Sequence, residues 1–392
     1  MFLASFIYWK VIPGKYRACF VVVCSTIALS VIQPKFTLLL FALTFGVFGA
    51  AKGIQSKKTS QKLLLGIAVL AIFLLVCKYG SSFMQRMFGH ELFFVQLLIV
   101  PLGVSYLVFK FIAFLLDVHR EVITDFTYFQ LLNFILFLPT FPAGPIERFQ
   151  NFESRHEDTF NWSFYAYGLQ RIAYGYVKKV ILLNFLLTEY FTKHIQPEVL
   201  GNINFDLGFF QVYQFFILAL LYSYLDLSSY ADLAVGYSRL FGYTIIEDMD
   251  KPVLKTNISG YWNSWHMSLS GWCRNNVYFP VLALSRRNNF ALYCSFFIMG
   301  IWHNVTLNWI LWGIWHATGL IVYAKWSKFK RKLYKKNTSL KGLVPLPVAT
   351  AVGVVLTCSY TSMSFAFIFL DGQTSIFQDA INAITLILAM FI

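Results

Sequence analysis

Long apolar runs recur along the chain and limit the folds that it can adopt. A helix needs about 20 mostly apolar residues to cross the hydrocarbon core of a bilayer. Segments of this kind predict about ten to twelve transmembrane or re-entrant helices, several of them interrupted. They lie at residues 18–34, 36–51, 62–80, 92–116, 126–142, 164–190, 207–225, 290–302, 305–324, 345–370 and 374–391.

Few charged residues are available to cover a surface that faces water. Only 13% of the 392 residues are charged, whereas soluble domains carry about 25%. Hydrophobic residues make up 58% of the chain, and the mean hydropathy is +0.61. No polar stretch is long enough to build a separate core. We therefore predict an all-α, polytopic integral membrane protein in which residues 1–392 form a single membrane-embedded domain.

Basic residues gather in loops between the apolar runs, and they give a formal net charge of +14. The clusters are Lys10, Lys15 and Arg17; Lys52, Lys57, Lys58 and Lys62; and the run at 325–341. Such clusters mark the cytoplasmic side of membrane proteins, so we expect the N-terminus and the 325–341 loop to be cytoplasmic. The last cluster also suits anionic lipid headgroups. This distribution favours membrane lipid, not nucleic acid, as a partner.

The segment 247–280 is too polar to cross lipid as an ordinary span, yet it is rich in aromatic residues. Thr256 or Asn257 is a suitable N-cap for a helix running toward Trp272. On that helix the residues Trp262, Trp265, Leu269 and Trp272 share one face, with His266 beside them. We predict an interfacial or protein-buried helix here.

Three of the seven histidines follow a tryptophan directly: His266, His303 and His316. An ionisable residue in an apolar segment is a candidate for function, because it must face a cavity or a partner. A metal site is disfavoured, since His303 and His316 would point roughly 140° apart on one helix and the six cysteines are scattered. No GxSxG turn presents a serine nucleophile, and Ser228 belongs to a polar patch. A buried histidine acting as general base on a bound hydroxyl remains.

Helical spacing separates two of these histidines. Trp302, Trp309 and His316 recur every seven residues, within about 20° of one helical face, so His316 can extend an aromatic packing stripe. His303 lies about 100° away from that stripe and precedes polar residues. On the residues alone, His303 is the stronger functional candidate.

Asp226 and Asp232 stand in a polar helical stretch, "YSYLDLSSYADLAVGYSRLFGY", that also contains Ser228 and Arg239. Two interpretations of this stretch remain open. The residues form either a buried network that orients a helix or the wall of a polar tunnel.

Five stretches carry a family resemblance. They are "LGVSYLVFKFIAFLLDVHR" (102–120), "LPTFPAGPIERFQNF" (138–152), "YSYLDLSSYADLAVGYSRLFGY" (222–243), "KPVLKTNISGYWNSWHMSLSGWCRNNVYFP" (251–280) and "GIWHNVTLNWILWGIWHATGL" (300–320). Together, and in this order, they resemble the membrane-bound O-acyltransferase (MBOAT) family, in its bacterial branch of alginate O-acetylation and teichoic-acid D-alanylation proteins. The family-like core spans about 100–320.

The resemblance implies helices around a central tunnel and acyl transfer to a hydroxyl. The family's catalytic histidine corresponds to His303, and a second histidine of the bacterial branch corresponds to His266. The positions implied as substrate-binding or tunnel-lining are Asn304, Trp302, Trp265, Asp226, Ser228, Arg274, Glu147, Arg148 and His316. No metal is implied. The sequence departs from the family at Asn304, where glycine is usual, at Asn263–Ser264, where a basic pair is usual, and at Asn275, where aspartate follows the arginine.

We therefore expect an O-acyltransferase of the bacterial cytoplasmic (inner) membrane that needs no bound cofactor. It would move an acetyl group from a cytoplasmic donor to a hydroxyl of an extracytoplasmic cell-envelope polysaccharide, or to a partner transferase at the periplasmic side or the cell surface. The donor is acetyl-CoA or an acylated phosphopantetheine carrier protein. Two alternatives stay open: D-alanyl transfer to teichoic acid from such a carrier, and, more distantly, a proton-coupled secondary transporter.

Overall fold

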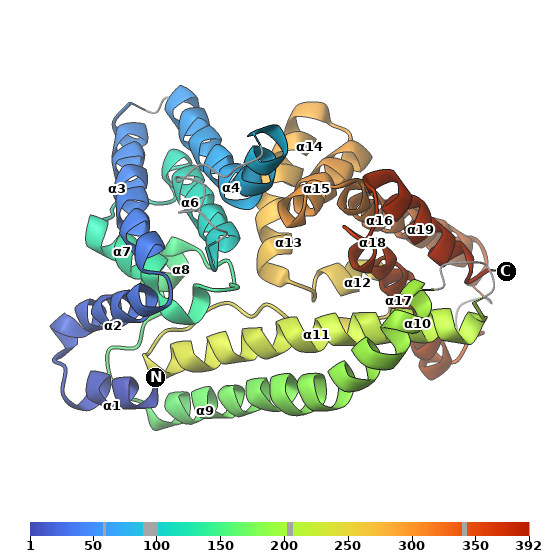
Figure 1. Ribbon diagram of the computed structural model, residues 1–392, viewed down its shortest axis with the longest axis horizontal. Coiled ribbons are helices and arrows are strands. Elements are labelled where there is room, and N and C mark those ends of the chain that lie inside the picture. Colours follow the sequence, from blue (N-terminus) through green and yellow to red (C-terminus); the bar gives the residue numbers. More distant parts are fainter. Residues whose placement is uncertain (58–59, 89–100, 202–206, 339–342, 392) are drawn as a thin grey trace. The chain divides into compact units, whose positions relative to one another are not determined.

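The computed structural model describes residues 1–57, 60–88, 101–201, 207–338 and 343–391 (Figure 1). Within these ranges every regular element is a helix, and one isolated β-bridge joins His156 to Tyr243. The predicted all-α fold class is thus confirmed. Residues 92–100 of one expected span, and the basic residues Lys58 and Lys341, lie outside the described residues.

Five helical stretches of the described chain are long and apolar enough to cross a membrane. They are Gly14–Ile32, Pro34–Ser56, Ser60–Gly80, Phe209–Leu240 and Leu346–Phe369. Other expected spans are shorter or divided. For example, 126–142 separates into α7 (Tyr128–Leu136) and the 3-10 helix η2 (Leu138–Thr140), where Pro139 has no backbone N–H to continue α7.

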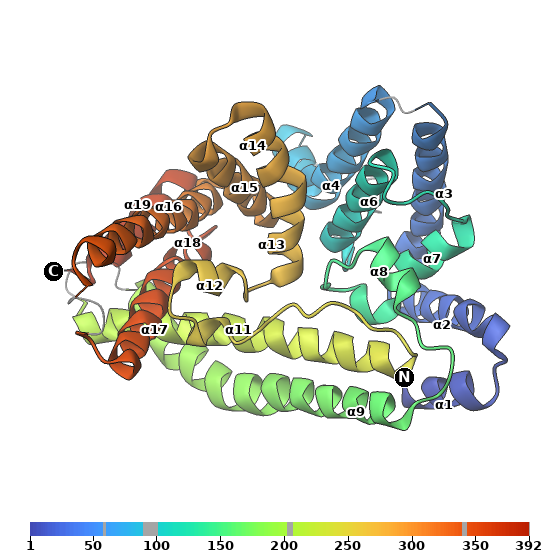
Figure 2. The same ribbon diagram turned by 180° about the vertical axis from the view of Figure 1, so that it is seen from behind.

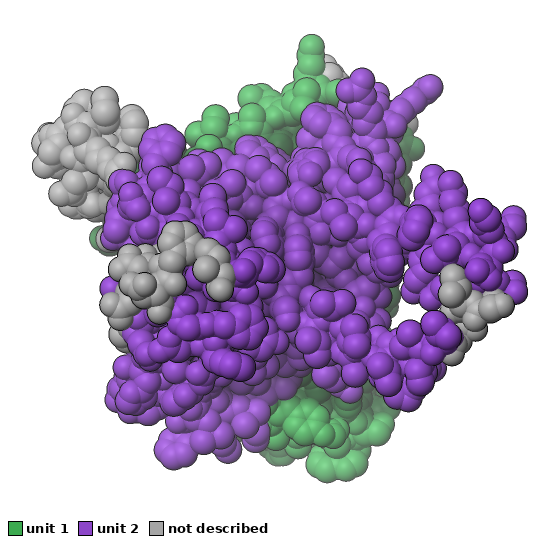
Figure 3. All heavy atoms as spheres, turned by 90° about the vertical axis from the view of Figure 1, so that its right-hand side faces the viewer, with its two compact units in different colours: residues 1–174, 231–247 green, residues 175–230, 248–392 purple. Residues whose placement is uncertain are grey.

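The chain groups into two compact units, coloured separately in Figure 3. Unit 1 contains residues 1–174 and 231–247, and unit 2 contains residues 175–230 and 248–392. Unit 1 holds α1 (Phe2–Lys10), α2 (Arg17–Ile32), α3 (Pro34–Lys57), α4 (Ser60–Phe88), α6 (Val104–His119), α7, α8 (Phe149–Ser154), most of α9 (Trp162–Tyr176) and the end of α11 (Phe209–Leu240). Unit 2 holds the start of α11, the π-helical η3 (Val177–Thr188), η4 (Phe191–Ile195), α10 (Gln196–Gly201), η5 (Pro252–Leu254), α12 (Ile258–Trp262), α13 (Met267–Cys273), η6 (Arg274–Tyr278), α14 (Phe279–Ser285), α15 (Asn288–His303), α16 (Leu307–Lys336), α17 (Leu346–Met363), α18 (Phe365–Phe369) and α19 (Ile376–Leu388).

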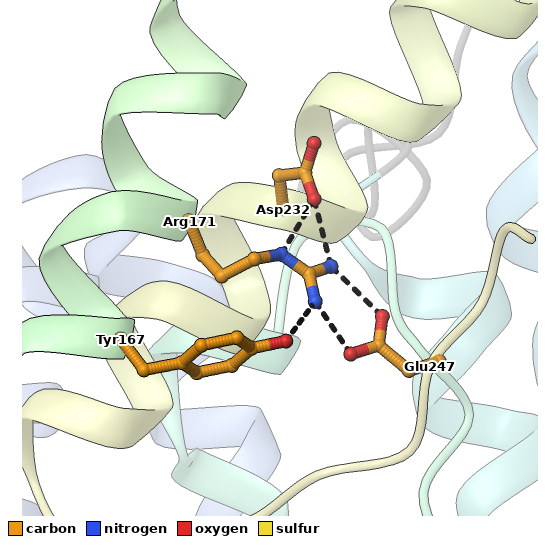
Figure 4. A network of polar contacts seen from close by, with 4 residues as sticks. All are labelled: Tyr167, Arg171, Asp232 and Glu247. Atoms are coloured by element: carbon orange, nitrogen blue, oxygen red, sulfur yellow. Dashed lines mark hydrogen bonds and ion pairs between the residues drawn. The ribbon is translucent and has the colours of Figure 1, made fainter. Parts of the chain in front are cut away.

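A bidentate ion-pair network joins α9 to the end of α11 in unit 1 (Figure 4). The Arg171 guanidinium donates from Nε to Asp232 Oδ1 at 2.7 Å and from Nη2 to Glu247 Oε2 at 2.8 Å. It also donates from Nη1 to the Tyr167 hydroxyl at 2.8 Å. Of the two interpretations of Asp232, this geometry favours the network that orients a helix.

The hairpin of α15 and α16 positions the candidate site in unit 2, and Figures 1 and 2 show the two helices side by side. Two glycines allow their close approach. A Cβ on Gly300 would lie 2.4 Å from the carbonyl oxygen of Trp309, and a Cβ on Gly313 would lie 2.7 Å from that of Phe296. Because any side chain at these positions would force the backbones apart, glycine sets the spacing that brings His303 against α16.

Candidate active site

Five of the eleven candidate site residues line one cavity of about 240 Å³ in unit 2. They are His303, His266, Trp265, Asp226 and His316. The other walls are Tyr222, Ser223, Leu227, Tyr261, Trp262, Leu269, Met299, Trp309, Trp312, Ser364, Phe365 and Ile368. The lining is largely aromatic. Within it, the ring of His303 stacks on a tryptophan, and the ring of His266 contacts a carboxylate.

His303 is the last residue of α15 and is held by aromatic rings. Its ring stacks on Trp309 with centroids 4.3 Å apart and planes 14° apart, and Trp302 meets it edge-on at 4.4 Å. A helix C-terminus favours a cation in its last turn, and a tryptophan face attracts a cation. Both surroundings would therefore suit a positively charged imidazolium at His303.

His266 lies at a break between α12 and α13 rather than within one continuous helix. Asn257 caps α12 as expected, with its side chain accepting from Gly260 N at 2.9 Å. The predicted helix toward Trp272 nevertheless stops after Trp262, and His266 takes a left-handed conformation with φ of 43°. Few residues other than glycine adopt this conformation, although histidine is among those that do so more often, and strained residues of this kind persist only where surrounding contacts hold them.

Asp248 supplies those contacts. Its Oδ2 lies 2.8 Å from His266 Nδ1, its Oδ1 accepts from Ser268 N at 2.8 Å, and its carbonyl oxygen accepts from Met267 N at 2.8 Å. Asp248 and His266 are 6% and 4% exposed, so water competes little for their contact. Burial alone would raise the pKa of Asp248, but the charge and hydrogen bond of His266 and the bonds from Ser268 outweigh it and lower that pKa.

His316 uses both ring nitrogens in the structure. Trp262 Nε1 donates to His316 Nδ1 at 3.3 Å, and His316 Nε2 lies 3.0 Å from the Ser364 hydroxyl. The Ser364 hydroxyl donates to the carbonyl oxygen of Thr361 at 2.7 Å, so it accepts from His316. These bonds give His316 a packing role in the cavity wall, as the aromatic stripe in the sequence indicated.

Asp226 faces the cavity and pairs with Lys179, whose Nζ lies 2.5 Å from Asp226 Oδ1. Lys179 stands on η3, a π-helical stretch. The sequence did not indicate Lys179 as a partner.

Four further candidate residues do not line this cavity: Asn304, Trp302, Ser228 and Arg274. The Asn304 side chain donates to Asp371 Oδ2 at 2.8 Å. Trp302 is 8% exposed and packs beside His266 and His303 without lining the cavity. Ser228 is buried in α11, whereas Arg274 lines a neighbouring cavity of about 320 Å³.

Glu147 and Arg148 belong to unit 1. The Glu147 carboxylate is 1% exposed and accepts from Arg148 N at 2.8 Å and from Ile246 N at 2.7 Å. Burial raises the pKa of this carboxyl, while those bonds oppose the shift. The Glu147 carboxylate thus connects the "GPI" turn to the segment that follows α11 by hydrogen bonds.

Two residues that contact the candidate site escaped the sequence reasoning: Asp248 and Asp371. Asp371 accepts from both Asn304 and Trp309 Nε1, the latter at 3.1 Å, and so holds the ring on which His303 stacks. Each aspartate lies outside the helices of its partners, so helical spacing in the sequence does not indicate these contacts. Across the described part of the chain, no three His, Cys, Asp or Glu side chains gather as metal ligands would.

Comparison with known proteins gives one family and several relatives. A model of the MBOAT, membrane-bound O-acyltransferase family, matches residues 19–365. A teichoic acid D-alanyltransferase of Streptococcus thermophilus is 30% identical over 288 residues, which are 69% of this chain and 68% of that protein. A probable alginate O-acetylase of Pseudomonas putida is 28% identical over 345 residues, 82% of this chain and 68% of that protein. A peptidoglycan O-acetyltransferase of Helicobacter pylori is 26% identical over 339 residues, covering 76% and 62% of the two chains.

Proposed function

Since the chain belongs to the membrane-bound O-acyltransferase family, as its sequence predicted, we propose that it moves an acetyl group onto a cell-envelope hydroxyl. Its class is plain from the family and the relatives: it is a multi-pass membrane O-acyltransferase. The proposal concerns the acyl group, its donor and its acceptor. We take acetyl-CoA as a cytoplasmic donor, and a hydroxyl of an extracytoplasmic polysaccharide or of a partner transferase as the acceptor.

One observation carries the proposal: two imidazoles, His303 and His266, share a small aromatic cavity. Its volume is about 240 Å³. That space suits a small acyl group beside a sugar hydroxyl better than it suits a long lipid chain. The tryptophan walls are apolar, and they would limit the water that can hydrolyse the thioester.

The two histidines would divide the chemistry. His303 takes the proton of the acceptor hydroxyl while the oxygen attacks the thioester carbonyl, and His303 returns that proton to the departing thiolate when the carbon–sulfur bond breaks. General base catalysis of this kind contributes roughly 10²–10⁴ in rate. His266 orients the acceptor or donates a hydrogen bond to the developing oxyanion, which is typically worth ~10²–10³.

The basic clusters support a membrane orientation. The run of exposed lysines and arginines at the end of α16 supports a cytoplasmic 325–341 loop, and the Lys10–Arg17 cluster supports a cytoplasmic N-terminus. This orientation would expose the protein to cytoplasmic acetyl-CoA in the inner membrane, with no cofactor held by the protein. Membrane lipid is the remaining partner we propose.

D-alanyl transfer is the second candidate, and one comparison favours it. The Streptococcus thermophilus relative shares 30% identity with this chain and is named for that reaction. In that case the donor would be a D-alanylated phosphopantetheine carrier protein and the acceptor teichoic acid. The secondary-transporter alternative loses its basis, because the family is one of acyltransferases.

Mass spectrometry of envelope polymers tests the function directly. Cells that lack the gene receive the wild-type copy, His303→Ala or an empty vector, and the ester-linked acyl groups released by mild base are identified. We expect acetyl esters with wild type and none with His303→Ala at equal levels of folded protein. D-alanyl esters would select the second candidate, and normal acylation by His303→Ala would refute the role of His303.

A further inference from the structure

The contact between Asp248 and His266 indicates which ring nitrogen of His266 can face a substrate. Asp248 holds the Nδ1 side of the ring, while the ring itself lines the cavity. Any hydrogen bond from His266 to a substrate must therefore pass through Nε2. Whether that nitrogen donates or accepts depends on which protons the ring carries.

We propose that Asp248 is a positioning residue that makes His266 a charged hydrogen-bond donor, aimed through Nε2 at the oxyanion of acyl transfer. This inference rests on the proposed function and selects the second of the two roles given to His266 there. A carboxylate in contact with an imidazole favours the imidazolium form. With Nδ1–H on Asp248 and a proton on Nε2, the ring presents a charge-assisted donor, which is about twice as strong as a neutral one.

The backbone around the pair supports a positioning role. Asp248 fixes the turn through Met267 N and Ser268 N, and two residues later Asp250 N donates to the carbonyl oxygen of Ser264 at 2.9 Å. Hydrogen bonds thus join the 248–250 loop to the backbone on both sides of His266. These bonds hold the left-handed φ of 43° at His266, and they set the direction in which the ring leaves the backbone.

Other titratable groups also face the cavity and could influence the ring. They are Tyr222 and Asp226 on α11, Tyr261 on α12, His303 on α15 and His316 on α16. Asp226 is already paired with Lys179, and His316 is bonded at both nitrogens. The Asp248 carboxylate lies 2.8 Å from His266 Nδ1, so its charge acts on that ring at close range.

The pH dependence of activity should differ between the wild type and Asp248→Asn. In the wild type, a neutral His266 keeps its proton on Nδ1 for Asp248 and has only a lone pair on Nε2. Donation to the oxyanion then ends when the ring loses its charge, so activity falls at alkaline pH. In Asp248→Asn, the amide oxygen takes the Ser268 N–H, and the amide NH₂ faces Nδ1. The neutral ring then carries its proton on Nε2 and donates at every pH.

The test is the pH profile of kcat/KM, from about pH 6 to pH 9.5, for full-length protein in nanodiscs. Acetyl-CoA and D-alanyl-S-pantetheine are the donor probes, and polymer extracted from the host envelope is the acceptor. We expect Asp248→Asn to be roughly 10- to 30-fold slower than wild type at neutral pH, since about half of the oxyanion stabilisation in free energy is lost. We also expect it to lack the alkaline fall in activity.

Asp250→Asn is the matched control, because the Asp250 carboxylate is 60% exposed and pairs with Lys255. It should reproduce the wild-type profile. His266→Gln is a second variant, which supplies an amide donor without titration and should also lack the alkaline fall, even if Asp248→Asn does not fold.

Three results would overturn the proposal. An unchanged alkaline fall in Asp248→Asn and His266→Gln would mean that Asp248 only stabilises the fold. Inactivity of Asp248→Asn equal to that of His266→Ala at every pH would mean that His266 accepts a proton rather than donates. A wild-type protein inactive with both donors would remove the proposed function itself, and this inference with it.

Discussion

The close contact of α15 with α16 predicts that one added methyl group will damage the site without removing any chemical group from it. In Gly300→Ala the new Cβ would begin 2.4 Å from the carbonyl oxygen of Trp309, whereas ordinary contacts start at 3.4 Å. The backbones must therefore separate by about 1 Å at the residue whose ring stacks on His303. Overpacking of this kind costs roughly 1–3 kcal/mol of stability, and a 1 Å misplacement of catalytic groups costs about 10² in rate.

Gly49→Ala is the control for this prediction, because a Cβ on Gly49 of α3 would meet nothing within 4 Å. Both variants are purified in the same detergent. Their thermal unfolding is followed by size-exclusion chromatography, and their acyl transfer is measured per folded molecule. We expect Gly49→Ala to match wild type or to unfold slightly later. If Gly300→Ala equals Gly49→Ala in both measurements, the spacing of α15 and α16 does not position His303.

Three further predictions concern parts of the molecule around the site. Arg171→Gln should lower the unfolding midpoint, with a loss of roughly 3 kcal/mol, because Asp232 would lose its cation; an unchanged midpoint would contradict the structural role of this network. His316→Ala should lower stability by about 1–3 kcal/mol through the unpaired groups it leaves, yet retain far more activity per folded molecule than His303→Ala, and equal inactivity would contradict its packing role. A cysteine introduced at Lys336 should react with a membrane-impermeant maleimide in inverted vesicles and not in intact cells, and labelling in intact cells would reverse the proposed orientation.

The sequence predicted the helical membrane fold because apolar run length is a local property. Its prediction was weaker where tertiary contacts override local preference. The helix expected from Asn257 to Trp272 is interrupted, since Asp248 and its neighbours hold His266 in a left-handed turn. Asp248 lies in the irregular segment before α12 and His266 in the turn before α13, so no single helix or strand relates the two and no spacing rule could have joined them. The sequence related His303 to His266 only through the family resemblance, because their common cavity depends on how α12, α13, α15 and α16 fold together.

Asn304 shows how a departure from a family pattern can be resolved by geometry. Glycine is the usual residue after the catalytic histidine, which raised the question of whether a side chain there narrows the cavity. The backbone at Asn304 is extended, with φ of −158° and ψ of 148°, so it needs none of the freedom of glycine. Its side chain turns to Asp371, which also accepts from Trp309. Asn304 therefore adds a tie to the end of α15 that helps Asp371 hold the ring under His303, and it leaves the cavity wall to other residues.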